Sequence, residues 1–146
     1  MICVDANVAA KWVLAEEHSD KALALVAACA RARQRIYAPP LLPIEVTNIL
    51  RQRTLKDAIS LADAQRLLRQ FLEFPVSIST PPNLYEEALA LAEAYNLPAV
   101  YDAHYVALAQ SLGCDLWTDD RRLLRALGNK LAFVKWIGDY TEGLAL

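Results

Sequence analysis

The sequence predicts an α/β domain in which five parallel strands alternate with helices that cover both faces of the sheet. Short apolar runs recur along the chain, and segments of helical length separate them. Hydrophobic residues make up 55% of the 146 residues, whereas glycine occurs only 4 times. This composition favours many helices with short connections over an all-β sandwich or a disordered chain. One domain is expected to span residues 1–146, without a linker or an internal repeat.

The first predicted strand is the apolar run Met1–Val4, which stops at Asp5. Four apolar residues are too few for a helix and show no polar alternation, so they predict a strand that is buried on both faces of a parallel sheet. An aspartate at the carboxyl end of such a strand lies where open α/β sheets bind their ligands. We therefore expect Asp5 to belong to a functional site.

The chain up to residue 72 carries clear signals for helix starts. Ser19 is expected to cap a helix with Asp20 in its first turn, where the helix dipole favours an acidic side chain. Pro43 suits the first position of the next helix. Ser60 and Asp63 form a start that resembles a capping box. The elements predicted after the first strand are a helix over 6–14, a helix over 19–32, a strand over 36–38, and helices over 42–53 and 60–72.

The second half of the chain continues the same alternation. Pro81 and Pro82 open a helix that ends near Tyr95, and Gly113 is expected to end the helix after that. Alternating strands and helices imply a parallel sheet with right-handed crossovers. The predicted elements are a strand over 75–79, helices over 83–95 and 103–112, a strand over 114–118, a helix over 121–127 and a strand over 132–136.

Charge and cysteine content limit the functional classes. The formal net charge is −2, so the chain lacks the basic excess that nucleic-acid binders often carry, although an acidic metal site within a mixed surface gives the same total. Cys3, Cys29 and Cys114 are widely spaced, which predicts buried reduced thiols, not a disulfide framework or a zinc site. No signal peptide and no apolar stretch of membrane-spanning length are visible, so we expect a cytoplasmic protein with no membrane contact.

Acidic residues stand at several places where a parallel sheet exposes the carboxyl ends of its strands. Asp5 ends the first strand, Glu45 lies in the first turn of the helix after the second, and Asp102 begins a helix. Asp119 and Asp120 follow the fourth strand. Singly, each is explained as a helix cap or as an acid near a helix dipole. Together they would repel one another unless cations neutralised them, and oxygen-only ligands suit Mg²⁺ or Mn²⁺ in phosphoryl chemistry.

At these residues the sequence resembles the PIN-domain ribonucleases, most closely the VapC-type toxins of toxin–antitoxin pairs. The segments that carry the resemblance are Val4–Val8, Pro43–Arg51, Val100–Ala109 and Leu116–Leu123, in the order of the family. The resemblance implies a PIN-like fold, a homodimer, and hydrolysis of RNA phosphodiesters with Mg²⁺ or Mn²⁺. It also implies a cognate VapB-like antitoxin protein as partner.

The resemblance also implies a set of site residues. The catalytic and metal-binding acids of the family fall on Asp5, Glu45, Asp102 and Asp120. The last acid of the family stands two residues after a threonine or serine, which selects Asp120 with Thr118 as a supporting hydroxyl and leaves Asp119 in the variable place between them. The remaining supporting positions are Asn7 and Asn48, which would orient carboxylates or water by hydrogen bonds.

Basic side chains and two helices are candidates for contacts with partners. The arginines that could face the RNA backbone are Arg51, Arg53, Arg121, Arg122 and Arg125. The helices 42–53 and 60–72 form the candidate groove for a segment of the antitoxin.

Three other functions stay open. The chain could be a PIN-type nuclease of RNA processing that has no antitoxin, or a non-catalytic interaction scaffold. A receiver-like signalling domain phosphorylated on aspartate is the third alternative. That fold would need adjacent acids after the first strand and a lysine at the end of the fifth, whereas Asp5 stands alone and Lys135 lies inside the strand.

Overall fold

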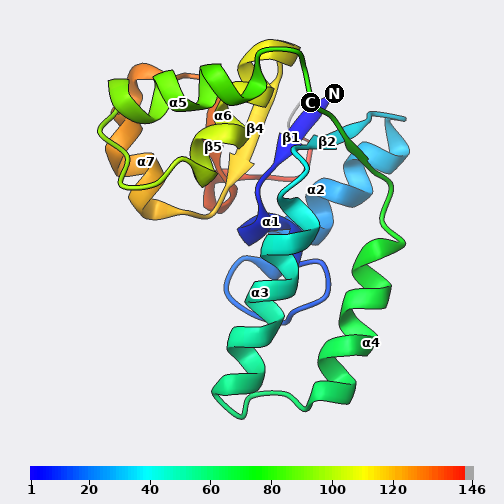
Figure 1. Ribbon diagram of the computed structural model, residues 1–146. Coiled ribbons are helices and arrows are strands. Elements are labelled where there is room, and N and C mark those ends of the chain that lie inside the picture. Colours follow the sequence, from blue (N-terminus) through cyan, green and yellow to red (C-terminus); the bar gives the residue numbers. More distant parts are fainter. Residues whose placement is uncertain (144–146) are drawn as a thin grey trace.

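The computed structural model describes residues 1–143, which contain one parallel five-stranded sheet. The strands are β1 (Ile2–Val4), β2 (Ile36–Ala38), β3 (Val76–Ile78), β4 (Asp115–Thr118) and β5 (Val134–Trp136). Their order in the sheet is β3–β2–β1–β4–β5, so β1 is the central strand. This arrangement confirms the predicted α/β fold, with helices on both faces of the sheet (Figure 1).

The α-helices within residues 1–143 are α1 (Ala6–Ala10), α2 (Ser19–Arg31), α3 (Leu42–Leu55), α4 (Leu61–Leu72), α5 (Leu84–Ala94), α6 (Tyr101–Leu112) and α7 (Arg121–Leu127). α6 packs against β1 and β4, and α5 packs against α6. α3 and α4 pack against each other as a helical hairpin that extends away from the sheet (Figure 1). No helix in the described part of the chain is long and apolar enough to cross a membrane.

The hydrophobic core surrounds β1. All three residues of this strand are buried, as the centre of a parallel sheet requires. On α6, Tyr105 and Leu108 are among the largest fully buried side chains. The three cysteines are buried and free, as predicted. Removal of this apolar surface from water supplies the main driving force for folding.

Local sequence signals predicted several helix ends correctly. The hydroxyl of Ser60 accepts a hydrogen bond from the backbone N–H of Asp63 at 3.0 Å and donates to the Asp63 carboxylate at 2.8 Å, so this pair caps α4 as predicted. Gly113 ends α6 with a φ of 63°, a left-handed conformation that glycine adopts without steric cost.

The segment between α1 and α2 differs from the prediction. α1 ends at Ala10, and Ser19 is the first residue of α2 instead of its cap. The hydroxyl of Ser19 donates to the carbonyl of Leu14 at 2.7 Å and accepts from the N–H of Glu16 at 3.0 Å. These two hydrogen bonds hold residues 14–19 in a turn of the loop before α2. The N-cap residue of α2 is His18, which has a φ of 64°.

Candidate active site

Hydrogen bonds at the carboxyl ends of β1 and β4 link three of the predicted site residues, which are Asp5, Thr118 and Asp120. Asp5 follows β1 and is only 4% exposed. One of its carboxylate oxygens accepts a hydrogen bond from the N–H of Val8 at 2.8 Å, which caps α1, and the other accepts from the hydroxyl of Thr118. The Thr118 oxygen in turn accepts a hydrogen bond from the backbone N–H of Asp120 at 2.9 Å. Thr118 therefore fixes the two aspartates relative to each other.

A small cavity beside Asp5, which we call the acidic cavity, has a volume of about 130 Å³. The polar side chains that line it are Asp5, Asn7, Glu45, Asn48, Asp102 and Tyr105. Three predicted acids and both predicted asparagines thus meet in one place, although they come from the end of β1 and from α1, α3 and α6. The hydroxyl of Tyr105 donates a hydrogen bond to the Glu45 carboxylate.

Asp120 borders the same region from α7. Its carboxylate accepts hydrogen bonds from the N–H groups of Arg122 at 2.7 Å and Leu123 at 3.1 Å, so it caps this helix. Its negative charge raises the pKa of both Asp5 and Asp102. Each of the four predicted acids therefore lies close enough to at least one of the others for its charge to shift a pKa.

Burial and mutual repulsion make the acidic cavity unfavourable for negative charge. Burial raises the pKa of Asp5 to about 7, although hydrogen bonds from Thr118 and Val8 oppose this shift. Burial also raises the pKa of Glu45 and of Asp102, and the charge of Asp102 raises the pKa of Glu45 further. A bound cation would favour the charged carboxylates and so reverse these shifts.

The donor chemistry of the cavity fits a hard divalent cation. Carboxylate and amide oxygens are the ligands that Mg²⁺ and Mn²⁺ prefer. Within residues 1–143, no group of three or more His, Cys, Asp and Glu side chains lies close enough to hold a metal ion in the positions observed. Mg²⁺ is commonly held by one or two carboxylates with water as its other ligands, so the cavity does not need three carboxylates in contact with the ion.

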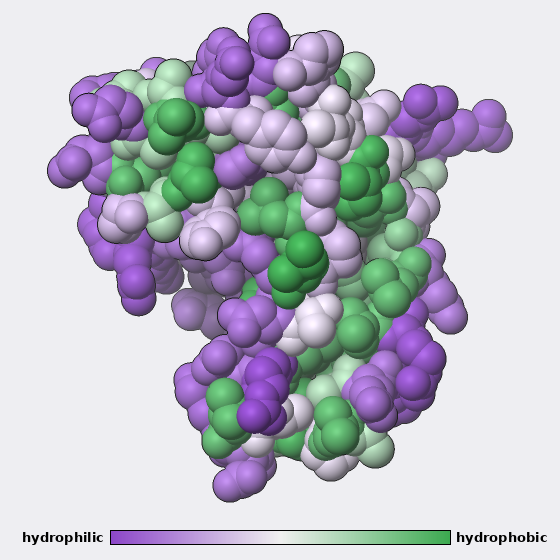
Figure 2. Space-filling view, viewed as in Figure 1, coloured by the Kyte–Doolittle hydropathy of each residue, from purple (hydrophilic) through white to green (hydrophobic). Residues whose placement is uncertain are grey.

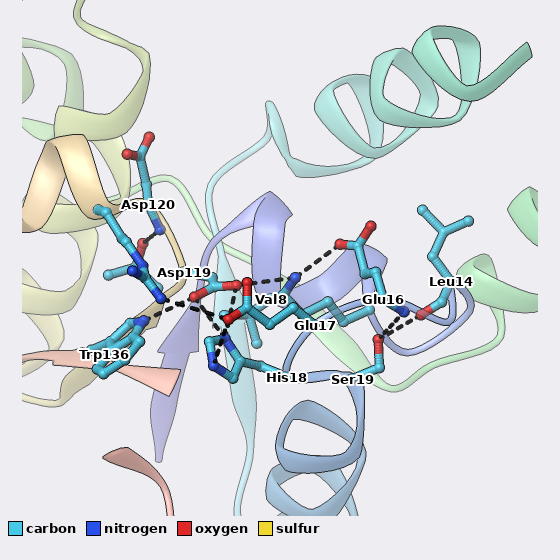
Figure 3. Close-up of polar contacts among 12 residues, drawn as sticks. Val8, Leu14, Glu16, Glu17, His18, Ser19, Asp119, Asp120 and Trp136 are labelled. Atoms are coloured by element: carbon cyan, nitrogen blue, oxygen red, sulfur yellow. Dashed lines mark hydrogen bonds and ion pairs between the residues drawn. The ribbon is translucent and has the colours of Figure 1, made fainter. Parts of the chain in front are cut away.

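Asp119 lies in a polar cluster with His18 and Trp136 (Figure 3) and is not among the residues that line the acidic cavity. Its carboxylate accepts a hydrogen bond from the Trp136 indole at 2.9 Å and lies 3.0 Å from the ammonium of Lys11 and 3.2 Å from Nδ1 of His18. Burial opposes the negative charge, but hydrogen bonds from Lys11, Trp136 and His18 outweigh it and lower the pKa of Asp119. Asp119 thus ties the loop 11–18 to the ends of β4 and β5, whereas the charge of Asp120 acts on Asp5 and Asp102.

Our interpretation of the sequence missed Tyr105 and Lys11. Tyr105 is 1% exposed and lies three residues after Asp102, a spacing that places both on one face of α6 and could have identified it. Lys11 is a buried cation whose two acidic partners are Glu16 and the distant Asp119. Only the fold brings Lys11 to Asp119, so no local pattern identifies that contact.

Replacing Lys11 with methionine should lower the free energy of unfolding by about 3 kcal/mol at neutral pH, because it removes one partner of a buried ion pair. The Lys11 side chain is 7% exposed and its ammonium lies 2.8 Å from Glu16. The pKa of Asp119 is lower in the folded protein than in the unfolded chain. The charge of Asp119 therefore stabilises the fold at a pH above its pKa in the unfolded chain, and this stabilisation is lost in acid. The loss caused by Lys11→Met should therefore shrink below about pH 4.

Urea denaturation at pH 7 and pH 3.5 would measure this loss. Lys56→Met is the matched control, since Lys56 is exposed and makes no ion pair with another residue of the described chain. Equal stability of the Lys11 variant and the wild type at pH 7 would show that the cluster does not hold the loop.

Comparison with known proteins identifies the fold family. Residues 2–129 of this chain match the family of PIN domains. The chain belongs to the PIN-domain family. The matched residues include all four predicted acids and the residues that line the acidic cavity. This PIN domain also has relatives whose names state an activity.

VapC ribonuclease Mb0985 of Mycobacterium bovis is 35% identical to this PIN domain over 123 residues, which cover 84% of this chain and 88% of that protein. Ribonuclease VapC3 of Pyrobaculum aerophilum is 31% identical over 124 residues, or 84% of this chain and 91% of that protein. The crystal structure of PAE2754 from Pyrobaculum aerophilum matches with a TM-score of 0.67 and 26% identity, covering 94% of this chain and 90% of that one.

Proposed function

We propose that this PIN domain is an endoribonuclease that uses Mg²⁺ or Mn²⁺ and acts as the toxin of a toxin–antitoxin pair. The observation that carries the proposal is the acidic cavity, where Asp5, Glu45 and Asp102 meet and Asp120 is close enough to raise the pKa of two of them. The names of the relatives, which are ribonucleases of the VapC type, support the same activity.

In this proposal Asp5, Asp102 and Asp120 hold the metal, and Glu45 is a further ligand or the acid that positions water. When bound, such an ion activates water and stabilises the charge on the attacked phosphate and the leaving oxygen. Burial raises the pKa of Glu45 above its ordinary value, which makes its carboxylate a better proton acceptor than an exposed glutamate.

Polar residues in and around the cavity hold the acids in place. Thr118 orients the Asp5 carboxylate, and Tyr105 orients that of Glu45, in each case by donating a hydrogen bond. Asn7 and Asn48 line the cavity and supply amide groups that can bind water or a phosphate oxygen. Asp119 supports Asp120 indirectly, by fixing the preceding backbone through its contacts with Lys11 and Trp136.

For the antitoxin, we propose a docking surface on the hairpin of α3 and α4. Large apolar side chains are exposed on both helices, and Figure 2 shows hydrophobic residues along this part of the molecule. They include Ile44 and Leu55 of α3 and Leu61 and Leu72 of α4. An amphipathic segment of a partner would cover such a surface.

For the homodimer, we propose an interface on α5 and the start of α6. Tyr85 and Leu89 of α5 and Tyr101 of α6 are large, apolar and exposed. Pairing of two copies through this surface would remove these side chains from water.

Cleavage of total cellular RNA by the purified protein tests the proposed function. With Mg²⁺ or Mn²⁺ we expect discrete fragments, and with EDTA we expect none, because the carboxylates need the cation to act on a phosphate. Identical fragments with and without EDTA would contradict metal-dependent cleavage. A folded protein that cuts no RNA under any of these conditions would favour the scaffold alternative.

A further inference from the structure

Two cysteines that are distant in the sequence bring their sulfur atoms together in the core. Cys3 lies in the middle of β1, and Cys114 directly precedes β4. Their Sγ atoms are 3.6 Å apart, although the two residues are 111 positions apart in the chain. β1 and β4 are adjacent parallel strands, and Cys3 is paired with Leu116, two residues after Cys114. Residues two apart along a strand share a face, so both thiols lie on one face of the sheet.

The two thiols differ in access and in acidity. Cys114 is 9% exposed, whereas Cys3 is 0% exposed. A hydrogen bond from the Cys3 thiol lowers the pKa of Cys114, although burial opposes this shift. The same contact, together with burial, raises the pKa of Cys3. Because the thiolate is the reactive form of cysteine, Cys114 is the nucleophile of the pair and Cys3 is its protonated neighbour.

We propose that Cys3 and Cys114 are a redox-sensitive pair, which a hydroperoxide converts into a disulfide bond that joins β1 to the start of β4 and stabilises the fold. Neither cysteine lines the acidic cavity, so this inference does not depend on the proposed ribonuclease function. The thiols are free in the structure, and a thiol reductant would restore this state after oxidation.

The oxidation takes two steps, with hydrogen peroxide as the simplest hydroperoxide. The Cys114 thiolate attacks a peroxide oxygen, so that an S–O bond forms, the O–O bond breaks and hydroxide leaves, which gives a sulfenic acid. The Cys3 sulfur then attacks the Cys114 sulfur. The S–S bond forms, the S–O bond breaks, and the departing hydroxide takes the Cys3 proton and leaves as water. The two thiols lose two electrons and two protons in total, and the peroxide is reduced to two molecules of water.

The position of Cys114 lets the two sulfurs approach each other. A disulfide needs an S–S distance of about 2.05 Å, which is shorter than the present separation. Cys114 lies between Gly113, which ends α6, and Asp115, the first residue of β4. It therefore belongs to a connection, and its backbone can shift without breaking the pairing of β1 with β4, which begins at Ile2 and Asp115.

The proposed bond lies at the centre of the sheet. β1 is the central strand and β4 is its neighbour (Figure 1). A bond between residues so distant in the chain restricts the unfolded state far more than the folded state. We therefore expect the oxidised protein to melt at least about 5 °C above the reduced protein.

Counting of thiols after treatment with hydrogen peroxide tests the pair, with EDTA present to remove trace metals. The third cysteine, Cys29, lies on α2 and is 1% exposed, so it is an internal control. We expect two of the three thiols to disappear and the intact mass to fall by two hydrogen atoms. Dithiothreitol should reverse both changes. Peptide mapping should find the peptides of Cys3 and Cys114 joined and the Cys29 thiol free.

Cys29→Ala is the matched control variant, because it should lose both of its thiols to the same intramolecular bond. Cys3→Ala should stop at the sulfenic acid of Cys114, which dimedone traps, and Cys114→Ala should keep both of its thiols. Thermal melting shows whether each variant is folded. Peptide mapping of the wild type decides the outcome if a variant is not folded.

The proposed pair is overturned if peroxide leaves all three thiols free, or if oxygen is added to the protein and no disulfide forms. A disulfide that includes Cys29, or one that joins two molecules, would also overturn it. An oxidised protein that melts no higher than the reduced one would overturn the proposed stabilisation of the fold.

Discussion

Replacing Asp102 with asparagine should lower the rate of RNA cleavage by more than about 100-fold. Loss of a residue that only supports a metal ligand lowers metal affinity or activity by roughly 10- to 100-fold, and a direct ligand should matter more. Asp102 is the most informative of the four acids for this experiment. Asp5 caps α1 and Asp120 caps α7, so their replacement alters capping hydrogen bonds as well as charge, although asparagine can also cap a helix. Asp102 lies inside the first turn of α6 and makes no capping hydrogen bond. Asparagine therefore removes the charge and leaves the fold unchanged.

Initial rates at saturating Mg²⁺, with protein prepared in parallel, would measure this loss. Asp20→Asn is the matched control, since Asp20 is an exposed aspartate in the first turn of α2 and lies outside the acidic cavity. Circular dichroism and thermal melting would show that both variants are folded. Retention of more than half of the wild-type rate by Asp102→Asn would contradict the proposed site.

Replacing Asp5 with asparagine should stabilise the protein at pH 8 in the absence of divalent metal by up to about 4 kcal/mol, from a pKa shift of about three units. Burial raises the pKa of Asp5 from 3.8 to about 7, so the folded protein retains a proton that the unfolded chain has already released. Ionisation therefore favours the unfolded state, and the wild type loses stability as the pH rises from about 4 to about 7. Asparagine does not titrate, so the variant lacks this loss.

Urea denaturation at pH 4.5, 6 and 8 with EDTA would measure the difference between the two proteins. We expect the advantage of Asp5→Asn to be small at pH 4.5 and largest at pH 8. Added Mn²⁺ should stabilise the wild type at pH 8 much more than the variant, because the ion binds the charged carboxylate of the folded state. A constant difference at all three pH values would show that burial does not shift the pKa of Asp5.

The elements of the fold were predictable where a local signal fixes them. Gly113 marks the end of α6, and Ser60 with Asp63 marks the start of α4, because a left-handed glycine and a capping box act through neighbouring residues. The order of strands and helices followed from the alternation of apolar runs. The predicted start of α2 was wrong because the Ser19 hydroxyl forms hydrogen bonds with Leu14 and Glu16 of the preceding loop instead of capping the helix. Which partners this hydroxyl finds depends on how the loop packs.

The meeting of the acids was predictable in outline, since parallel strands place their carboxyl ends at one edge of the sheet. Nothing in the sequence distinguished Asp119 from Asp120 except the resemblance to PIN-domain ribonucleases. In the structure the partners of Asp119 are Lys11, His18 and Trp136, which reach it from other parts of the chain. Contacts over such separations depend on the fold and leave no local pattern, which is also why the buried role of Lys11 was missed.

The metal site itself is the central claim, and anomalous diffraction from crystals soaked in Mn²⁺ tests it most directly. The account predicts an anomalous peak in the acidic cavity, with carboxylate oxygens of Asp5, Asp102 and Asp120 at about 2.1–2.2 Å, close to the distances of small hard cations in oxygen sites. It also predicts that the peak is absent from crystals of Asp102→Asn. A peak at the cluster of Asp119 and Glu16, or no peak at a cavity whose carboxylates are ordered, would contradict the account.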